Sequence, residues 1–222
     1  MDGTLPDAIA SFARALGPEP DSVIAEMDER ADDEGFPTVG PAVGGWLQML
    51  ARLVDARRVF EFGSGFGYSA YWFARALPAD GEVVLTEVDA GELDAAREYM
   101  ARGGFESIAR YELGDAIETV EDYEGPFDVV LVDNEKHRYR EAFEAVRAKV
   151  PVGGVVVADN AMTAGVVDFD ALRRLVAGDD VADANRHTRG VADYVRRVGD
   201  DPAFETTLLP LGEGVAVSCR TE

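Results

Sequence analysis

The chain has 222 residues, 47% of them hydrophobic, and its 43 Asp and Glu against 21 Lys and Arg give a formal net charge of −22. A chain of this length buries roughly 70% of the surface that its unfolded form exposes, so we expect a self-sufficient core and no extensive disorder. The negative charge excludes nucleic acid and membranes as expected partners. One Cys, no long apolar run and an acidic N-terminus predict a cytoplasmic protein without a disulfide framework or a signal peptide.

Helical periodicity dominates the first 55 residues. The first predicted helix stops at Gly17, and the second opens at Pro20-Asp21 and dissolves into residues 31–37. A third helix is predicted over about 40–55. We interpret this part of the chain as an N-terminal helical extension.

After residue 57, short apolar strands alternate with helices. The runs are rich in β-branched residues and almost continuously hydrophobic, as in strands covered on both faces. Such alternation predicts an α/β fold with a parallel sheet and right-handed crossovers. The strand candidates are 57–63, 82–89, 127–133 and 153–160, and the helices between them are 69–77, 91–101 and 138–150.

Two more strands are predicted at about 203–209 and 214–220. The link between them permits an antiparallel hairpin and is too short for a parallel crossover. We therefore expect one domain over 1–222. Its parts are the N-terminal helices (1–55), a cofactor-binding core (56–160), and a lid or insertion followed by the hairpin (161–222).

A glycine-rich loop follows the first predicted strand. Glycines let the backbone turn sharply and approach a ligand, and the helix that follows offers free backbone amides. Glu87 lies 20 residues beyond the loop, at the end of the next strand, where a carboxylate can accept hydrogen bonds from both hydroxyls of a ribose. The arrangement predicts a nucleoside cofactor.

Two residues distinguish among nucleosides. Tyr68 occupies the position where a dinucleotide-binding loop has its third glycine. Glu61 would repel a pyrophosphate but suits an ammonium group and a sulfonium centre. S-adenosylmethionine is such a ligand. An NAD-dependent oxidoreductase and a purely structural turn are the alternatives.

Five motifs together resemble the metal-dependent O-methyltransferase family that includes catechol and caffeoyl-CoA O-methyltransferases. The likeness runs from about Val39 to the end of the chain, in the order and spacing of the family. It implies a Rossmann-like S-adenosylmethionine methyltransferase fold, a mostly parallel seven-stranded sheet with a C-terminal antiparallel hairpin. It also implies methyl transfer to a hydroxyl of a small, catechol-like acceptor. The motifs are EFGSGFGYSA (61–70), TEVD (86–89), LGDA (113–116), VDNEKHRY (132–139) and ADN (158–160).

The resemblance also implies which residues bind the cofactor. In S-adenosylmethionine, it places Val39 near the methionine moiety, Glu87 at the ribose hydroxyls, and Asp115 and Ala116 near the adenine ring. We interpret Tyr68, Trp72 and Trp46 as core aromatics. The full predicted cofactor set is Val39, Glu61, Gly63, Ser64, Gly65, Ser69, Glu87, Asp115, Ala116 and Asp133.

Asp133 ends the predicted strand 127–133, and Asp159 and Asn160 end the predicted strand 153–160. Neighbouring strand ends bring these oxygen donors together at the crevice of an open α/β sheet. Two carboxylates and an amide carbonyl suit a hard cation such as Mg²⁺, Ca²⁺ or Mn²⁺, and the resemblance assigns the matching positions as metal ligands. A turn or helix cap at Asp159-Asn160 is the alternative.

Lys136 matches the catalytic lysine of the family. We expect it to act as general base toward a substrate hydroxyl, which an Arg could not do. A surface lysine at a helix start is the alternative. We interpret the adjacent His137 as exposed on its turn and not as a base.

Departures from the family pattern concern the acceptor and the partner. Near 188–195 the family has a Phe-Asn pair that frames the acceptor, where this chain offers Tyr194-Val195, which argues against a caffeoyl-CoA-like acceptor. The segment 164–187 is interpreted as a surface insertion or lid. The alternatives to methyl transfer to a hydroxyl are transfer to a different nucleophile, N or S, and a catalytically idle scaffold.

Because family members are often dimers, we expect a homodimer that uses the N-terminal helices.

The charged residues themselves have an unusual composition. Lys136 and Lys149 are the only lysines, and acids are scattered along the whole chain. A scattered excess is typical of a solvated surface. The composition resembles that of proteins from salt-accumulating archaea, and an acidic mesophilic protein is the alternative.

Overall fold

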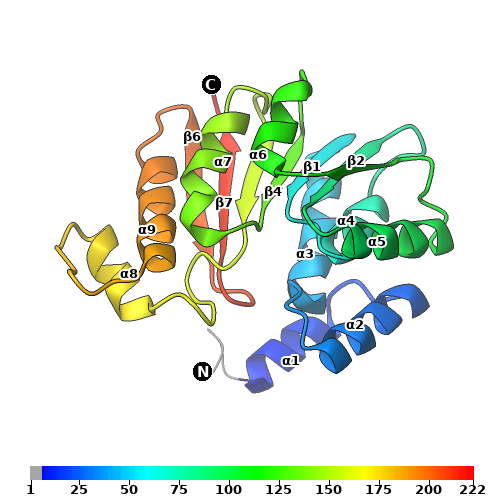
Figure 1. Cartoon of the computed structure of the whole chain (residues 1–222), viewed down its shortest axis with the longest axis horizontal. Helices are drawn as coiled ribbons and strands as arrows, with labels where there is room; N and C mark the ends of the chain where they lie inside the picture. The colour runs from blue at the N-terminus through cyan, green and yellow to red at the C-terminus, as the bar shows by residue number, and fades with distance from the viewer. Residues whose placement is uncertain (1–6) are drawn as a thin grey trace.

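The centre of the molecule is a seven-stranded sheet (Figure 1). This computed structural model describes residues 7–222. The strand order is β3-β2-β1-β4-β5-β7-β6, in which the first five strands are parallel and β7 runs antiparallel to both of its neighbours. This confirms the predicted fold. The strands are β1 (Arg58–Phe62), β2 (Glu82–Glu87), β3 (Ala109–Leu113), β4 (Val129–Val132), β5 (Val155–Ala158), β6 (Phe204–Leu209) and β7 (Val215–Arg220).

The central strands are buried on both faces. All four residues of β4, and likewise of β5, are buried. Val129 and Leu131 belong to one apolar cluster, and Val130 and Val132 belong to another on the opposite face. This alternation explains why the strands have continuous apolar runs in the sequence, because both of their faces are covered.

Helices cover the two faces of the sheet. On one face, α2 to α5 contribute Ile24, Leu47, Trp72 and Leu93 to the first cluster, and on the other α6, α7 and α9 complete the second. The helices are α1 (Asp7–Ala15), α2 (Ser22–Glu34), α3 (Gly40–Leu53), α4 (Tyr68–Ala74), α5 (Ala90–Arg102), α6 (Ala116–Thr119), α7 (Tyr139–Val146), α8 (Phe169–Val176) and α9 (Arg186–Gly199). Two 3-10 helices, η1 (Val120–Asp122) and η2 (Lys136–Arg138), precede α7.

Helix α2 and strand β3 differ from the sequence-based prediction, which also contained no helix at the positions of α6, α8 and α9. Helix α2 does not dissolve after residue 30 but continues to Glu34, where Gly35 adopts a left-handed conformation with φ of 64°. Buried Ala31 and an ion pair between Arg30 Nε and Glu34 Oε2 at 3.1 Å stabilise this last turn. Strand β3 was not among the strand candidates because this edge strand is only partly buried and lacks an apolar run.

The predicted insertion at 164–187 contains its own packed helix. Helix α8 begins after Asp168, which caps it by accepting a hydrogen bond from the backbone N–H of Ala171 at 3.0 Å. Leu172 and Leu175 pack with Val191 of α9 in a third apolar cluster. The segment is therefore a folded element attached to α9, and its role as a lid stays a prediction.

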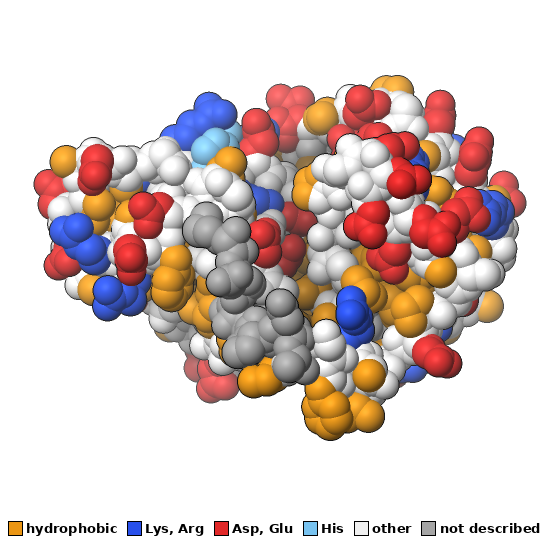
Figure 2. Space-filling model, turned by 90° about the horizontal axis from the view of Figure 1, so that it is seen from below, with side chains coloured by type: hydrophobic (Ala, Val, Ile, Leu, Met, Phe, Trp, Pro, Cys, Tyr) orange, Lys and Arg blue, Asp and Glu red, His pale blue; other side chains and the backbone are white. Residues whose placement is uncertain are grey.

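Acidic side chains are spread over both halves of the face that Figure 2 shows, and do not gather in one patch. Many Arg residues pair with them, as Arg102 Nη1 does with Glu26 Oε1 at 2.7 Å. Exposed pairs of this kind contribute about 0–1 kcal/mol each to stability. No helix within residues 7–222 is long and apolar enough to cross a membrane.

Candidate functional site

The carboxyl ends of three central strands meet at one edge of the sheet. Phe62, Val132 and Ala158 are register partners at the ends of β1, β4 and β5. Gly63, Asp133 and Asp159 therefore follow at the same level. Three cavities of about 550, 190 and 40 Å³ open here, and Gly63 and Asp133 line all of them.

The backbone geometry at position 63 requires a glycine. Its φ is 82°, a conformation that favours glycine, and a Cβ atom there would lie 2.9 Å from the carbonyl oxygen of Asp133. A larger residue would therefore push the β1 and β4 ends apart. The glycine loop thus serves close packing of two strand ends as well as access to the cavities.

The largest of the three cavities contains half of the residues predicted to bind the cofactor. Gly63, Glu87, Asp115, Ala116 and Asp133 all line it. The Glu87 carboxylate accepts hydrogen bonds from the backbone N–H of Gly65 at 2.9 Å and of Val88 at 2.8 Å. Gly65 itself does not line a cavity, and its contribution is this hydrogen bond, which orients Glu87.

Asp115 is held from two sides. Its Oδ1 accepts the backbone N–H of Ile117 at 2.9 Å, and its Oδ2 accepts a hydrogen bond from Arg138 Nη1 at 2.6 Å. Burial alone would raise the pKa of Asp115, but these hydrogen bonds outweigh it and lower the pKa below its ordinary value. Asp115 therefore remains ionised and fixed beside the cavity.

The smallest of the three cavities has a buried carboxyl next to one of its lining residues. Val39, Ser64 and Ser69 line it, and Glu61, which lines none of the three cavities, interacts with Ser69. Glu61 is 0% exposed, and neither of its oxygens has a hydrogen-bond partner. Burial raises its pKa to about 8 although the nearby Ser69 side chain acts in the opposite direction, and the negative charge of Asp133 adds to the rise. A buried carboxylate without a partner is costly, so the site is suited to a cationic group.

The cavity of 190 Å³ contains the predicted metal and catalytic residues. Asp133, Lys136, Asp159 and Asn160 line it together. Lys136 Nζ, on η2, donates to Asp133 Oδ1 at 2.8 Å. Tyr139 is fully buried and its hydroxyl donates to the carbonyl oxygen of Asp159 at 3.0 Å, which ties the start of α7 to the end of β5.

Asp159 has the environment of a cation ligand. It is 4% exposed, and its Oδ1 has no hydrogen-bond partner. Burial raises its pKa to about 8, with the negative Asp133 as the next cause. A buried carboxyl with an unpartnered oxygen, next to the half-buried carboxylate of Asp133, suits a bound cation, which would allow Asp159 to ionise.

Asn160 completes this donor set. It has a φ of 54°, and its Nδ2 donates to Glu213 Oε2 at 2.6 Å. Because a carboxylate can only accept, Oδ1 is left as the acceptor atom of the amide. Within residues 7–222 no group of three or more His, Cys, Asp or Glu side chains could hold a metal ion. The fit to a hard cation therefore depends on the amide oxygen of Asn160 beside the two carboxylates.

The structure corrects one interpretation and clarifies others. His137 is not exposed: it is half-buried, and its ring lies 5.6 Å from that of His187. Tyr68 and Trp72 are buried in the core as predicted, whereas Trp46 is only partly buried against it. Tyr194 is 0% exposed and packs edge-on against Tyr139 and Phe143, so it does not frame an acceptor.

Sequence reasoning missed three residues of the site. Phe36 and Glu213 line the 190 Å³ cavity from loops far away in the sequence, and Arg138 fixes Asp115. Arg138 lies within the motif VDNEKHRY, so its position was a usable signal. Phe36 and Glu213 had no local pattern, since only the tertiary fold brings their loops to the strand ends.

Comparison with known proteins identifies the family. A family model described as O-methyltransferase matches residues 23–221. The chain belongs to this O-methyltransferase family. A catechol O-methyltransferase of Niastella koreensis is 36% identical over 171 residues, which cover 73% of this chain and 76% of that protein.

Other relatives agree with this placement. A caffeoyl-CoA O-methyltransferase 2 of Populus trichocarpa is 28% identical over 80% of this O-methyltransferase chain and 72% of its own length. The crystal structure of the O-methyltransferase TomG from Streptomyces achromogenes, a complex with S-adenosylmethionine, has a TM-score of 0.82 and 25% identity. The match covers 97% of this chain and 96% of that one.

Proposed function

We propose that this O-methyltransferase transfers the methyl group of S-adenosylmethionine to a hydroxyl of a small, catechol-like acceptor with the help of a divalent cation. The observation that carries the proposal is a pair of buried carboxyls without full partners, Glu61 near the end of β1 and Asp159 after β5, on either side of β4. Each suits a positive group, the first a cofactor and the second a metal ion.

We assign the cofactor to the cavities of 550 and 40 Å³. Glu87, oriented by backbone amides, would accept hydrogen bonds from the ribose, and Asp115 and Ala116 would border the adenine. Val39, Glu61, Ser64 and Ser69 would surround the methionine end. When bound, S-adenosylmethionine supplies an electrophilic methyl group on a sulfonium centre. The relative crystallised with this cofactor supports the assignment.

Asp133, Asp159 and Asn160 would hold the cation, for which Mg²⁺, Ca²⁺ or Mn²⁺ is suitable. When bound, the cation lowers the cost of ionising an acceptor hydroxyl. The chain itself orients these donors, because Glu213 holds the amide of Asn160 and Tyr139 holds the backbone of Asp159.

Lys136 is the proposed general base. Its Nζ lies in the same cavity as the three proposed metal ligands, and the ion pair with Asp133 fixes its position. In its neutral form it would accept the proton of the acceptor hydroxyl at Nζ. The catechol O-methyltransferase relative and the limited volume of the cavity support a small acceptor. An N or S acceptor is the second candidate.

Two variants and a chelator test the proposal. Lys136→Ala should lower kcat for a catechol at least about 100-fold, since general bases contribute 10²–10⁴-fold. Isothermal titration should show that S-adenosylmethionine still binds with a similar Kd. Asp159→Ala and excess EDTA should each abolish methyl transfer. Full activity in EDTA would contradict the metal role, and product methylated only on N or S would contradict the hydroxyl acceptor.

We also infer a homodimer that forms through the N-terminal helices. Ile9, Phe12, Leu16 and Leu53, from α1, its C-terminal end and α3, are each more than half exposed. Apolar side chains exposed together in this way are typical of contact surfaces.

A further inference from the structure

Gly190 lies in the middle of α9, where nothing in its backbone conformation requires glycine. Its φ is not in the left-handed region, and glycine destabilises a helix interior relative to alanine. A Cβ atom at this position would lie 2.4 Å from His137 Cα and 2.5 Å from the carbonyl oxygen of Lys136. Both atoms belong to the backbone of η2. The missing side chain therefore allows the lysine segment to lie directly against the helix.

Gly190 is the centre of a helix face that contacts this segment. His187, Gly190 and Tyr194 are spaced by three and four residues, which places them on one face of α9. The His187 ring lies 5.6 Å from the ring of His137, and the Tyr194 ring lies 5.7 Å from that of Tyr139. This face of α9 thus supports residues 136–139 along their whole length.

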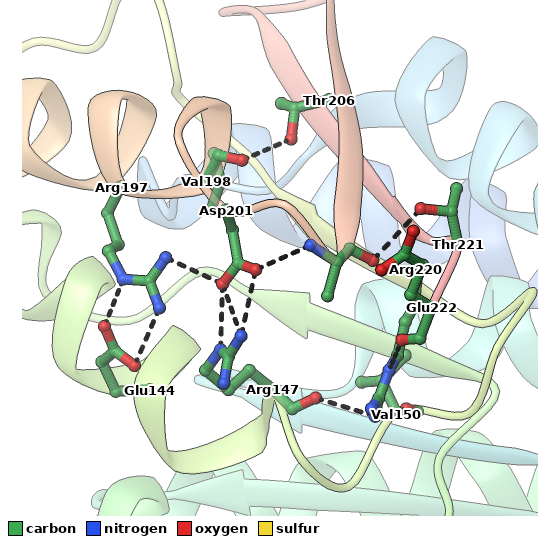
Figure 3. Close-up of polar contacts among 11 residues, drawn as sticks. Glu144, Arg147, Val150, Arg197, Val198, Asp201, Thr206, Arg220, Thr221 and Glu222 are labelled. Carbon is green, nitrogen blue, oxygen red and sulfur yellow. Dashed lines mark hydrogen bonds and ion pairs between the residues drawn. The ribbon is translucent and has the colours of Figure 1, made fainter.

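Helix α9 is anchored at its C-terminal end. Figure 3 shows Asp201, just beyond the helix, between two arginines: it accepts from Arg147 Nε at 3.0 Å and from Arg197 Nη1 at 2.8 Å. Asp201 is 3% exposed. The carbonyl oxygen of Val198 accepts a hydrogen bond from Thr206 Oγ1 of β6 at 3.2 Å.

The N-terminal half of the helix is held as well, because Val191 packs in the apolar cluster with α8. Because these contacts hold α9 in place, a methyl group added at Gly190 must displace η2. Lys136 is part of η2, and its Nζ is 2.8 Å from Asp133 Oδ1.

We propose that Gly190 is a positioning residue for Lys136. It allows η2 to pack directly against the anchored α9, and this packing holds Lys136 Nζ within hydrogen-bond distance of Asp133. This inference rests on the proposed role of Lys136 as general base. Gly190 contacts neither substrate nor cofactor: no residue of α9 lines any of the three cavities.

Gly190→Ala tests the inference, with Gly199→Ala as a matched control. Gly199 is the last residue of the same helix, and a Cβ atom there would meet nothing within 4 Å. A misplacement of about 1 Å can cost 10²-fold in rate, so kcat of Gly190→Ala should fall about 10- to 100-fold. The Kd of S-adenosylmethionine by isothermal titration should stay within about twofold. Gly199→Ala should match the parent protein in both quantities.

A double variant separates positioning from general damage. If Gly190 acts through Lys136, adding Gly190→Ala to Lys136→Ala should cause no further loss of kcat. A further loss of tenfold would overturn the inference, and so would a Gly190→Ala protein with unchanged kcat. The proposed function fails separately, if Lys136→Ala alone retains full activity.

His187→Ala decides the matter if Gly190→Ala does not fold. This change removes one contact of the same helix face without crowding η2. It should lower kcat about 3- to 10-fold, with the Kd of S-adenosylmethionine unchanged. An unchanged kcat in His187→Ala would then overturn the inference.

Discussion

At the scale of single residues, Glu61 couples protonation to stability. Its folded pKa of about 8 lies above its ordinary value of 4.5. The folded protein thus retains a proton that the unfolded chain releases. The free energy of unfolding must therefore fall as the pH rises from about 4.5 to about 8, and this contribution is constant above that range.

The cofactor-free Glu61→Gln variant should show a smaller fall. One pKa unit corresponds to about 1.4 kcal/mol, so the loss of unfolding free energy between pH 5.5 and 8.5 should shrink by about 1–3 kcal/mol. Urea titrations at both pH values measure this difference. Asp159, whose pKa is also raised, titrates in both proteins and cancels. Parallel pH profiles for the two proteins would contradict the assignment.

Residue types at strand ends were the most informative signal in the sequence. Parallel strands meet at one edge, so Asp133, Asp159 and Asn160 could be placed together without coordinates. The half-burial of His137 could not be predicted from the sequence. It depends on Gly190 and His187 of α9, a helix about fifty residues further along the chain. Sequence distance hides such contacts.

At the scale of elements, burial on two faces decided what could be predicted. Strands β4 and β5 stood out because every residue is apolar, whereas β3 has the sequence ARYEL and only its first residue is buried. The position of β3 is fixed by its pairing with β2. This tertiary interaction cannot be predicted from the residues of β3 alone. An edge position alone does not hide a strand, since β6 at the opposite edge was predicted at about 203–209.

The N-terminal helices carry the prediction of a dimer. If α1 and α3 form the contact, Phe12→Glu combined with Leu53→Glu should convert the dimer to a monomer, because burying two carboxylates in an apolar interface is unfavourable. Both side chains are exposed, at 68% and 77%, so the fold itself should tolerate the changes. Light scattering at a fixed, high salt concentration measures the mass. A parent protein that is monomeric under those conditions would contradict the dimer.

For the whole molecule, the acidic residues divide into two groups. Five of the 43 acids are those assigned to the site, and four of these five lie in surroundings that raise or lower their pKa through burial and specific partners: Glu61, Asp115, Asp133 and Asp159. The fifth is Glu87, which backbone amides orient. Glu135 and Glu213 also line the cavities. Most of the other acids are scattered along the chain, so the net charge of −22 reports mainly on solvation.

This division predicts that salt stabilises the protein. Repulsion among scattered acids acts over about 10 Å at 0.1 M salt and about 3 Å at 1 M, so screening removes most of it. Raising KCl from 0.1 M to 2 M should increase Tm by about 5–10 °C, equivalent to roughly 2–3 kcal/mol for a chain of this size. A triple variant, Glu121→Gln, Asp122→Asn and Glu124→Gln, removes three exposed neighbouring charges. It should have a higher Tm than the parent at 0.1 M KCl and a smaller gain with salt. A Tm that is highest in dilute buffer would show that the acids are not the main destabilising repulsion, and that an ordinary acidic protein is the better description.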